Sequence, residues 1–200
     1  MPVEAVVFDI GNVLIEWNPE RFFDAKIGED RRRALFATVD LHKMNDAVDR
    51  GGDLATVVQD EARKYPEWEA DILIWRDHWL DMVGPTIEPS VTILRELRAQ
   101  GVPVFALSNF GRGTFEMSVP QYPFLEEFDR SYISGRLGVI KPDAEIYRRV
   151  EEDCGVAPSG LLFTDDRADN IATAASRGWQ THLFDGPQGF RARLVAEGVL

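Results

Sequence analysis

The chain has 200 residues, of which 44% are hydrophobic and 28% charged, and its formal net charge at pH 7 is −12. These values are typical of a folded globular protein with one large domain or a core and an insert. Such an acidic surface repels nucleic-acid phosphates and anionic lipids, so we expect neither as a partner.

Cys154 is the only cysteine in the chain. A single cysteine excludes an intrachain disulfide, and it favours a reducing, cytoplasmic location. At the N-terminal end, Asp9 interrupts the first apolar run and no basic residues precede it. We therefore expect neither a signal peptide nor a membrane span there.

Three apolar runs, each followed by polar residues, predict the buried strands of a parallel sheet. They are Val3–Phe8, Val102–Leu107 and Leu161–Phe163. Continuous apolar runs of this kind are typical of strands that are covered on both faces. A further short strand is expected at Thr181–Phe184.

Helical patterns separate these runs, and most of them end at a glycine, which is common just beyond helix C-termini. Strands that alternate with helices at this spacing predict an α/β fold, a Rossmann-like doubly wound parallel sheet. The expected core helices are Val91–Gln100, Ala144–Cys154, Ala168–Arg177 and Phe190–Ala196.

Residues 18–84 differ from the rest, because they carry helical periodicity and few strand signals. Helices are expected at Arg31–Val39, Leu54–Tyr65 and Trp68–Met82, the last two separated before Pro66. We therefore predict a core formed by residues 1–17 and 85–200, and an α-helical cap formed by residues 18–84 and inserted between the first two core strands.

Polar residues follow each of the three predicted strands, so they are expected to lie together at one edge of the sheet. In doubly wound sheets, ligands bind at this edge, outside the carboxyl ends of the strands. Asp9 follows the first strand, Ser108 and Asn109 the second, and Asp165 and Asp166 the third. Each alone has a structural explanation, such as turn formation or capping of the next helix. Together, the three carboxylates repel each other and stay charged only with compensation.

Lys141 precedes Pro142, which disfavours helix at the residue before it, so a loop is expected there. Lys141 and a hard dication with oxygen ligands would supply the compensating charge. The same cations would admit an anion into an otherwise acidic surface. The residues therefore predict an anion site with a divalent cation at this edge of the sheet.

In this order the motifs resemble those of the haloacid dehalogenase superfamily. Its pattern is a nucleophilic Asp after the first strand, Ser or Thr after the second, Lys before a helix, and an acidic pair after the next strand. The helical insert is similar to the C1-type cap of this family. The corresponding stretches are FDIGNVL with Asp9, ALSN with Ser108, GVIKP with Lys141, and FTDDRADNI with Asp165 and Asp166.

The resemblance implies that Asp9 attacks phosphorus and forms an aspartyl phosphate, which water then hydrolyses. It implies that Mg²⁺ is bound by the Asp9 carboxylate, the Gly11 backbone carbonyl and Asp166. Asp165 would orient Lys141 or a metal-bound water.

The resemblance also implies a phosphate-binding set. Ser108 and the Asn109 backbone would donate hydrogen bonds to the phosphoryl oxygens, and Lys141 would neutralise their charge. The expected ligand is a small phosphorylated metabolite, bound by a monomer or homodimer.

Gly11 departs from the family pattern, because most family phosphatases carry a second Asp there as general acid and base. Either another residue does this work, with His42 the first candidate, or the leaving group needs little help. The motif is most similar to that of bacterial α-D-glucose-1-phosphate phosphatases, which carry Gly there and release an easily displaced anomeric hydroxyl. We therefore expect sugar 1-phosphates first among the substrates.

Two other functions stay open. Haloacid dehalogenases attack carbon without a metal and lack an acidic pair such as Asp165-Asp166. A non-catalytic binding protein on the same scaffold is the other, and Gly11 is compatible with it. Aromatic residues of the cap region either line a substrate pocket or form the core of the cap, and a core role is expected. They are Trp17, Phe22, Phe23, Trp75 and Trp79.

Overall fold

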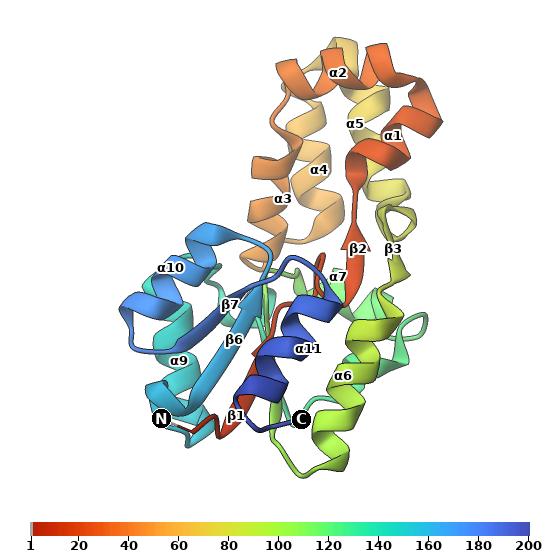
Figure 1. Ribbon diagram of the computed structural model, residues 1–200. Coiled ribbons are helices and arrows are strands. Elements are labelled where there is room, and N and C mark those ends of the chain that lie inside the picture. Colours follow the sequence, from red (N-terminus) through yellow and green to blue (C-terminus); the bar gives the residue numbers. More distant parts are fainter. Residues whose placement is uncertain (1) are drawn as a thin grey trace.

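The computed structural model describes residues 2–200 and shows a five-stranded sheet between two layers of helices, with a helical insert at one end (Figure 1). Every pairing in the sheet is parallel, in the order β5-β4-β1-β6-β7. The α/β doubly wound prediction is therefore confirmed. The strands are β1 (Ala5–Phe8), β4 (Val104–Ser108), β5 (Arg130–Ile133), β6 (Leu161–Asp165) and β7 (Gln180–Leu183).

The chain builds the sheet outward from β1 in both directions, so the strand order reverses at β1. Doubly wound sheets bind ligands at such a switch point. Alternate residues of β1 face opposite layers. Val6 and Phe8 belong to the core cluster that includes residues of α6 (Glu88–Ala99) and α11 (Pro187–Ala196), and Val7 to the cluster with α9 (Ala144–Cys154) and α10 (Ala168–Ser176).

The helical insert begins and ends at a two-stranded antiparallel sheet of β2 (Ile15–Trp17) and β3 (Val83–Thr86). Figure 1 shows the insert beyond the carboxyl ends of the sheet strands. No helix within residues 2–200 is long and apolar enough to cross a bilayer. The insert helices are α1 (Pro19–Ile27), α2 (Glu29–Thr38), α3 (Leu41–Asp49), α4 (Leu54–Ala62) and α5 (Glu69–Asp77), with a 3₁₀ turn at Pro66–Trp68.

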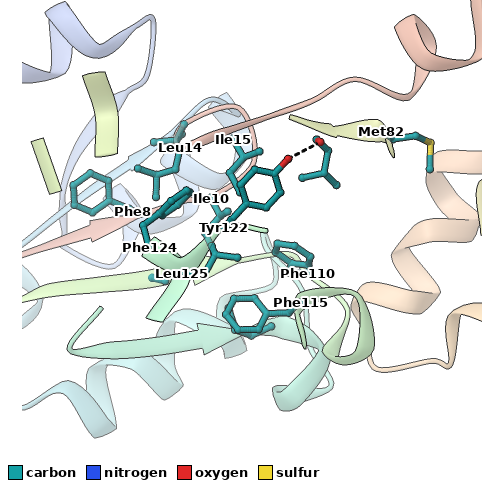
Figure 2. Close-up of a cluster of buried hydrophobic side chains, with 14 of the residues drawn as sticks. Phe8, Ile10, Leu14, Ile15, Met82, Phe110, Phe115, Tyr122, Phe124 and Leu125 are labelled. Atoms are coloured by element: carbon teal, nitrogen blue, oxygen red, sulfur yellow. Dashed lines mark hydrogen bonds between the residues drawn. The ribbon is translucent and has the colours of Figure 1, made fainter. Parts of the chain in front are cut away.

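A cluster of buried apolar side chains lies between the sheet and this connection, and Figure 2 shows it. The Tyr122 hydroxyl donates a hydrogen bond of 2.8 Å to the backbone carbonyl of Val83, at the start of β3. Phe110 and Phe115 lie beside it, with ring centroids 5.4 Å apart. The connection to the insert is therefore part of the core of the protein.

The single helix expected at Trp68–Met82 is wrong, because the chain turns at His78. The α5 helix ends just before this residue, and a 3₁₀ turn at Trp79–Met82 follows. Trp79 is buried, with its ring centroid 5.3 Å from that of Trp17 and 5.5 Å from that of Phe110. Packing of Trp79 against the core outweighs the helical periodicity.

The helices α1 and α3 are absent from the prediction, although both begin at clear N-caps. Asn18 accepts a hydrogen bond from the backbone N–H of Arg21 at 2.9 Å, and Pro19 occupies the first helical position. Asp40 accepts one from the N–H of Lys43 at 2.9 Å. Each helix is only nine residues long, and two of the five buried positions of α3 are polar, Asn45 and Asp49.

The expected core helices are present, with α6 and α11 beginning earlier than predicted. The edge strand β5 is missing from the prediction, because it has four residues and its first half is solvent-accessible. The short helices α7 (Arg112–Ser118) and α8 (Ser134–Leu137) were not predicted either. These two helices are where the insert meets the core.

The C-terminal end of α3 is fastened to the core by one hydroxyl group. Ser134 Oγ donates a hydrogen bond of 2.6 Å to the backbone carbonyl of Asp49, and it accepts one of 2.9 Å from the N–H of Phe110. Ser134 is fully buried, so this link is shielded from water. The insert therefore has a fixed point of attachment at Asp49.

Two glycines allow the backbones to approach closely at this attachment. A Cβ atom on Gly135 would lie 2.8 Å from the Cα of Gly111 and would overlap the backbone nitrogen of Arg112. A Cβ atom on Gly111 would lie 2.7 Å from Cγ1 of Val48 in α3. Only glycine leaves room for these contacts.

We expect Gly135→Ala to lower the free energy of unfolding by about 1–3 kcal/mol, the usual cost of overpacking. The matched control is Gly113→Ala in α7, where a Cβ atom meets no other atom within 4 Å. Alanine favours a helix over glycine by about 1 kcal/mol, so this control should gain stability. Urea unfolding measures both. Undiminished stability of Gly135→Ala would contradict the close contact.

Candidate active site

A cavity of about 340 Å³ lies between the carboxyl ends of the sheet strands and the helical insert. Six of the seven site residues predicted from the sequence line it: Asp9, Gly11, Ser108, Asn109, Lys141 and Asp166. The seventh, Asp165, is fully buried and contacts Lys141. The structure thus brings all seven together.

The buried ammonium group of Lys141 lies between two carboxylates. Its Nζ is 2.9 Å from Oδ1 of Asp9 and 2.6 Å from Oδ2 of Asp165. Burial lowers the pKa of Lys141, but the Asp165 and Asp9 carboxylates raise it more, so the pKa lies above its ordinary value. Lys141 therefore stays charged at neutral pH.

The loop that carries Lys141 is held by a side-chain amide at the end of the neighbouring strand. Asn109 Nδ2 donates a hydrogen bond of 2.9 Å to the Lys141 carbonyl, and its Oδ1 accepts one of 2.7 Å from the Lys141 N–H. This pair of bonds fixes the Lys141 backbone relative to β4. The loop predicted before Pro142 is present, and Asn109 explains why its lysine points into the site.

Both carboxylate oxygens of Asp165 are occupied by donors from the protein. Oδ2 accepts from Lys141, Oδ1 accepts from the N–H of Arg167 at 2.8 Å, and Asn170 Nδ2 lies 3.0 and 2.9 Å from the two oxygens. Asp165 does not cap the following helix, because the N-cap of α10 is Arg167 and no side chain caps that helix. Because both oxygens of Asp165 already accept hydrogen bonds, Asp165 orients Lys141, and metal binding is left to Asp9 and Asp166.

Asp9 and Asp166 are less crowded. Asp9 Oδ1 accepts from the N–H of Ile10 at 2.7 Å and from Lys141, and Asp166 Oδ2 accepts from Asn12 Nδ2 at 3.1 Å. Within residues 2–200, the other oxygen of each carboxylate accepts no side-chain hydrogen bond. Each of these two residues thus keeps an oxygen for a ligand.

The cluster of Asp9, Asp165 and Asp166 places an oxygen of each residue within 4.8 Å of the others. Burial raises the pKa of Asp9 to about 7; Lys141 opposes the rise and Asp165 adds to it. Burial also raises the pKa of Asp166. A further cation would offset this repulsion. Hard oxygen donors with too few protein ligands for a closed cage fit Mg²⁺, which keeps several of its waters.

The rest of the cavity lining makes the need for a cation stronger. Its basic groups are Lys141 and Arg167, with the half-exposed His42 beside them, and six carboxyl groups surround them. An anionic ligand would be repelled by such a lining unless a divalent cation were bound beside it. The carboxyl groups are those of Asp9, Glu16, Glu20, Asp46, Asp49 and Asp166.

The insert contributes residues that no site prediction included. Asn45, Asp46 and Asp49 of α3 line the cavity. The expectation that the aromatic residues form a core holds for Trp75 and Phe23, which are fully buried, whereas Trp17 and Trp79 line the cavity, as the alternative had it. Helix α3 was not predicted, so its residues had no assigned position.

Of the three histidines, His42 alone lines the cavity. Its Nε2 lies 2.9 Å from Oε1 of Glu20, on an exposed part of the insert. His182 lies on β7 with its ring 5.2 Å from that of Phe190, and His78 pairs with Asp81. The choice of His42 as the first histidine to consider therefore agrees with its position.

Two asparagines that orient the site lie within the sequence motifs but were not predicted as site residues. Asn12 bonds Asp166 through Nδ2, while its Oδ1 accepts from the N–H of Trp17 at 2.9 Å. Its φ of 56° lies in the left-handed region, which asparagine tolerates better than most residues. Asn170 is buried and bonds Asp165. A buried polar residue on the inner face of a predicted helix was the available signal.

The family model for haloacid dehalogenase-like hydrolases matches residues 3–178. The chain belongs to this family. Among solved structures, a haloacid dehalogenase family enzyme from Bacteroides thetaiotaomicron has a TM-score of 0.74 at 22% identity, over 93% of this chain and 95% of that one. The same enzyme in complex with magnesium and inorganic phosphate has a TM-score of 0.70 at 19% identity, over 92% and 95%. These structures show a shared fold.

Three of the curated relatives match shorter stretches of the chain. A sesquiterpene phosphatase from Aspergillus oryzae is 30% identical over 95 residues, 47% of this chain and 48% of that protein. A D-ribitol-5-phosphate phosphatase from Bacteroides thetaiotaomicron is 32% identical over 80 residues, 40% and 39% of the two chains. An (S)-2-haloacid dehalogenase from Pseudomonas fluorescens is 27% identical over 104 residues, 52% and 46%. The matches span less than half of each relative's length.

We expect Lys141→Met to lower the free energy of unfolding by about 3–5 kcal/mol in chelator-containing buffer at neutral pH, because it leaves two buried carboxylates without their cation. The loss should shrink as the pH falls, since protons can then neutralise carboxyl groups whose pKa has been raised. The control is Arg63→Met, which removes an exposed pair with Asp60 and should change little. A stability loss no larger than the control's would contradict the bridging role.

Proposed function

We propose that this hydrolase is a Mg²⁺-dependent phosphatase of small phosphate monoesters that acts through an aspartyl phosphate on Asp9. The observation that carries the proposal is the cluster in which Lys141 bridges Asp9 and Asp165, with Asp166 beside them, in an otherwise acidic cavity. A phosphate ester is attracted there only when a divalent cation is bound. The two curated phosphatases and the magnesium and phosphate complex of the related enzyme support this choice.

In the proposed reaction, the Asp9 carboxylate attacks phosphorus while the Ile10 N–H and Lys141 hold it in place. Ser108, the Asn109 backbone and Lys141 bind the phosphoryl oxygens, where charge accumulates during transfer. Asp165 keeps Lys141 charged and oriented.

The metal site of this proposal consists of the Asp9 carboxylate, the Gly11 backbone carbonyl and Asp166. Bound Mg²⁺ supplies positive charge that offsets the phosphate and aligns it for in-line attack. Asn12 orients Asp166 through its side-chain amide. Asp165 stays outside the ligand set because its oxygens already have donors.

For the substrate, we propose a small polyhydroxylated phosphate ester, with sugar 1-phosphates first. On the insert side the cavity combines the carboxyl groups of Glu16 and Glu20 with the rings of Trp17 and Trp79. Such a lining offers acceptors to hydroxyl groups and an apolar surface to a sugar ring. The similarity of the Gly11 motif to glucose-1-phosphate phosphatases and the ribitol-phosphate relative support this class.

In the same proposal, residues 18–84 act as a C1-type cap that covers the site and selects the leaving group, while residues 1–17 and 85–200 form the core. Cys154 is buried and free, in agreement with a reducing compartment. We therefore propose a cytoplasmic enzyme that works as a monomer or homodimer.

Dehalogenation of 2-haloacids is the second candidate, because one curated relative carries that name. It needs no metal and no acidic pair after the third motif strand. Here Asp166 keeps an oxygen for a ligand and lies within 4.8 Å of two other carboxylates, which favours the phosphatase.

We expect p-nitrophenyl phosphate hydrolysis to stop when the divalent cation is removed by a chelator, and to return when Mg²⁺ is added, because the acidic cavity then admits the phosphate again. Release of inorganic phosphate is the measurement. Halide release from 2-chloropropionate is measured in parallel with the chelator present. Chelator-resistant halide release without phosphatase activity would contradict the proposal and show that the protein is a dehalogenase.

We expect Asp9→Asn to lower kcat for every phosphate ester by more than about 10³-fold, because the amide is a poor nucleophile. The matched control is Asp60→Asn, an exposed residue of the insert paired with Arg63, which should leave kcat unaltered. Circular dichroism checks that both variants are folded. Substantial turnover by folded Asp9→Asn protein would show that another group is the nucleophile.

A further inference from the structure

The proposed reaction lacks a group that protonates the leaving oxygen, because position 11 is glycine. The backbone does not force this choice. A Cβ atom on Gly11 would meet Trp17 Cβ at 3.9 Å, an ordinary contact, and Gly11 is outside the left-handed region. A side chain would therefore fit at position 11. Because glycine is present there instead, a proton donor for the leaving oxygen has to come from elsewhere in the site.

The geometry of phosphoryl transfer says where that replacement lies. The attacking and leaving oxygens are roughly in line through phosphorus. Asp9 attacks from the sheet side, so the leaving oxygen lies on the opposite side, toward the helical insert. The insert and its connection place four carboxyl groups in the cavity lining: Glu16, Glu20, Asp46 and Asp49.

Asp49 is the one of these four that is buried, with 8% of its surface exposed. Glu16 forms an exposed pair with Arg21, and Glu20 faces His42 at 2.9 Å. Asp46 is exposed on the same helix, and the positive charge of Arg167 acts on it. The other three therefore have cationic or histidine neighbours, whereas within residues 2–200 Asp49 has no cationic or histidine partner in a hydrogen bond or ion pair.

Hydrogen bonds hold the carboxyl group of Asp49 in a fixed orientation. Asn45 Oδ1 accepts from the indole N–H groups of Trp75 and Trp79, at 3.1 and 3.4 Å. Indoles only donate, so the NH₂ group of Asn45 must face Asp49, where Nδ2 donates to Oδ2 at 3.0 Å. Oδ2 of Asp49 is thereby held by Asn45, and the backbone amide of Gly111 also donates to this carboxyl group.

The backbone of Asp49 is fixed as firmly as its side chain. Its carbonyl accepts the 2.6 Å bond from Ser134, and the neighbouring Val48 packs against Gly111 at a distance that no larger residue allows. Asp49 thus lies at the point where the insert is fastened to the core. An acid at this position stays at a constant distance from the phosphate site even if the rest of the insert moves.

The electrostatic surroundings favour a neutral carboxyl group. Burial raises the pKa of Asp49 to about 7, and the negative charges of Asp46 on its own helix and Asp9 on the sheet add to the rise. The Gly111 backbone amide and Asn45 oppose it. A group that titrates near neutral pH can both give and take a proton during turnover.

We infer that Asp49 is the general acid and base of this enzyme, supplied by the insert in place of a residue at position 11, with Asn45 as its positioning residue. The inference rests on the proposed phosphatase function. As Asp9 attacks, the bond from phosphorus to the leaving oxygen breaks and its electron pair takes the proton from Asp49, which becomes a carboxylate. That carboxylate then takes a proton from the water that attacks the aspartyl phosphate, which releases inorganic phosphate and restores both aspartates.

This assignment changes the expected substrate range. A leaving oxygen that receives a proton need not be acidic, so alkyl esters of sugars become substrates alongside sugar 1-phosphates. The dependence of rate on leaving-group acidity should therefore be shallow in the unaltered enzyme. A steep dependence of rate on leaving-group acidity should appear only when Asp49 is replaced, because Gly11 then leaves the leaving oxygen without a proton donor.

The test compares Asp49→Asn with the unaltered enzyme in saturating Mg²⁺, over phosphate monoesters of similar size and graded leaving-group acidity. General acid catalysis contributes about 10²–10⁴-fold, so kcat/KM should fall by that factor for an alkyl ester and by less than about tenfold for the most acidic aryl ester. Asp49→Ser is the second variant if the asparagine variant does not fold. An equal loss for all esters would overturn the inference.

A second measurement follows the other half of the cycle. Without its base, the variant should hydrolyse the aspartyl phosphate slowly, so acid-quenched Asp49→Asn protein should carry a phosphoryl group on Asp9 during turnover. Mass spectrometry of the Asp9 peptide detects it. A variant with no accumulated phosphoryl group and an unchanged slope would show that Asp49 transfers no proton.

Two control variants separate this role from general damage. Asp60→Asn is the same chemical change at an exposed residue of α4 outside the cavity lining, and it should keep the shallow slope of the unaltered enzyme. Asn45→Leu should make the dependence of kcat/KM on leaving-group acidity steeper, because Asp49 loses its orientation. If Asn45 had a merely structural role, the variant would lower kcat/KM equally for all esters. A steep slope in Asp46→Asn alone would move the acid to Asp46. If the unaltered enzyme hydrolyses no ester, the proposed function fails and not this assignment.

Discussion

The site depends on one buried cation, the ammonium group of Lys141 between Asp9 and Asp165. Without it, carboxylates from two strands would be buried side by side with no partner, at a cost of several kcal/mol. Asn109 at the end of β4 holds the Lys141 backbone, so the same arrangement ties three strands together at one edge. Stability and chemistry thus rest on the same contacts, and Asp166 beside them is left free for a metal.

The second constraint is the close contact between the insert and the core. Ser134, Gly135 and Gly111 bring the end of α3 against α7 and α8, and this contact carries Asp49 into the cavity. A cap that only covered a site would not need such a fixed point. In the proposed reaction this arrangement divides the work: the sheet edge would hold the nucleophile and the phosphate, and the insert would hold the leaving group and its proton donor.

The sequence was sufficient for the sheet edge and insufficient for the insert. Asp9, Ser108 and Asp165 lie at the carboxyl ends of strong apolar strands in a known order, and the topology alone brings them together. Asp49 is a polar residue on the buried face of a nine-residue helix, and its position depends on contacts with Ser134 and Gly111 from a distant part of the chain. Tertiary contacts of this kind leave no local pattern. The same holds for the break at His78, which the packing of Trp79 imposes.

The central claim is that Asp9 attacks phosphorus and is regenerated by water. Single-turnover hydrolysis of a phosphate ester in heavy-oxygen water tests it most directly, with mass spectrometry of both the released phosphate and the Asp9 peptide. Because water attacks the phosphorus of an aspartyl phosphate, the label should appear in phosphate and be absent from Asp9. Attack on carbon, as in a dehalogenase, ends in hydrolysis of a carboxylate ester. Label in the Asp9 carboxylate would therefore contradict the account.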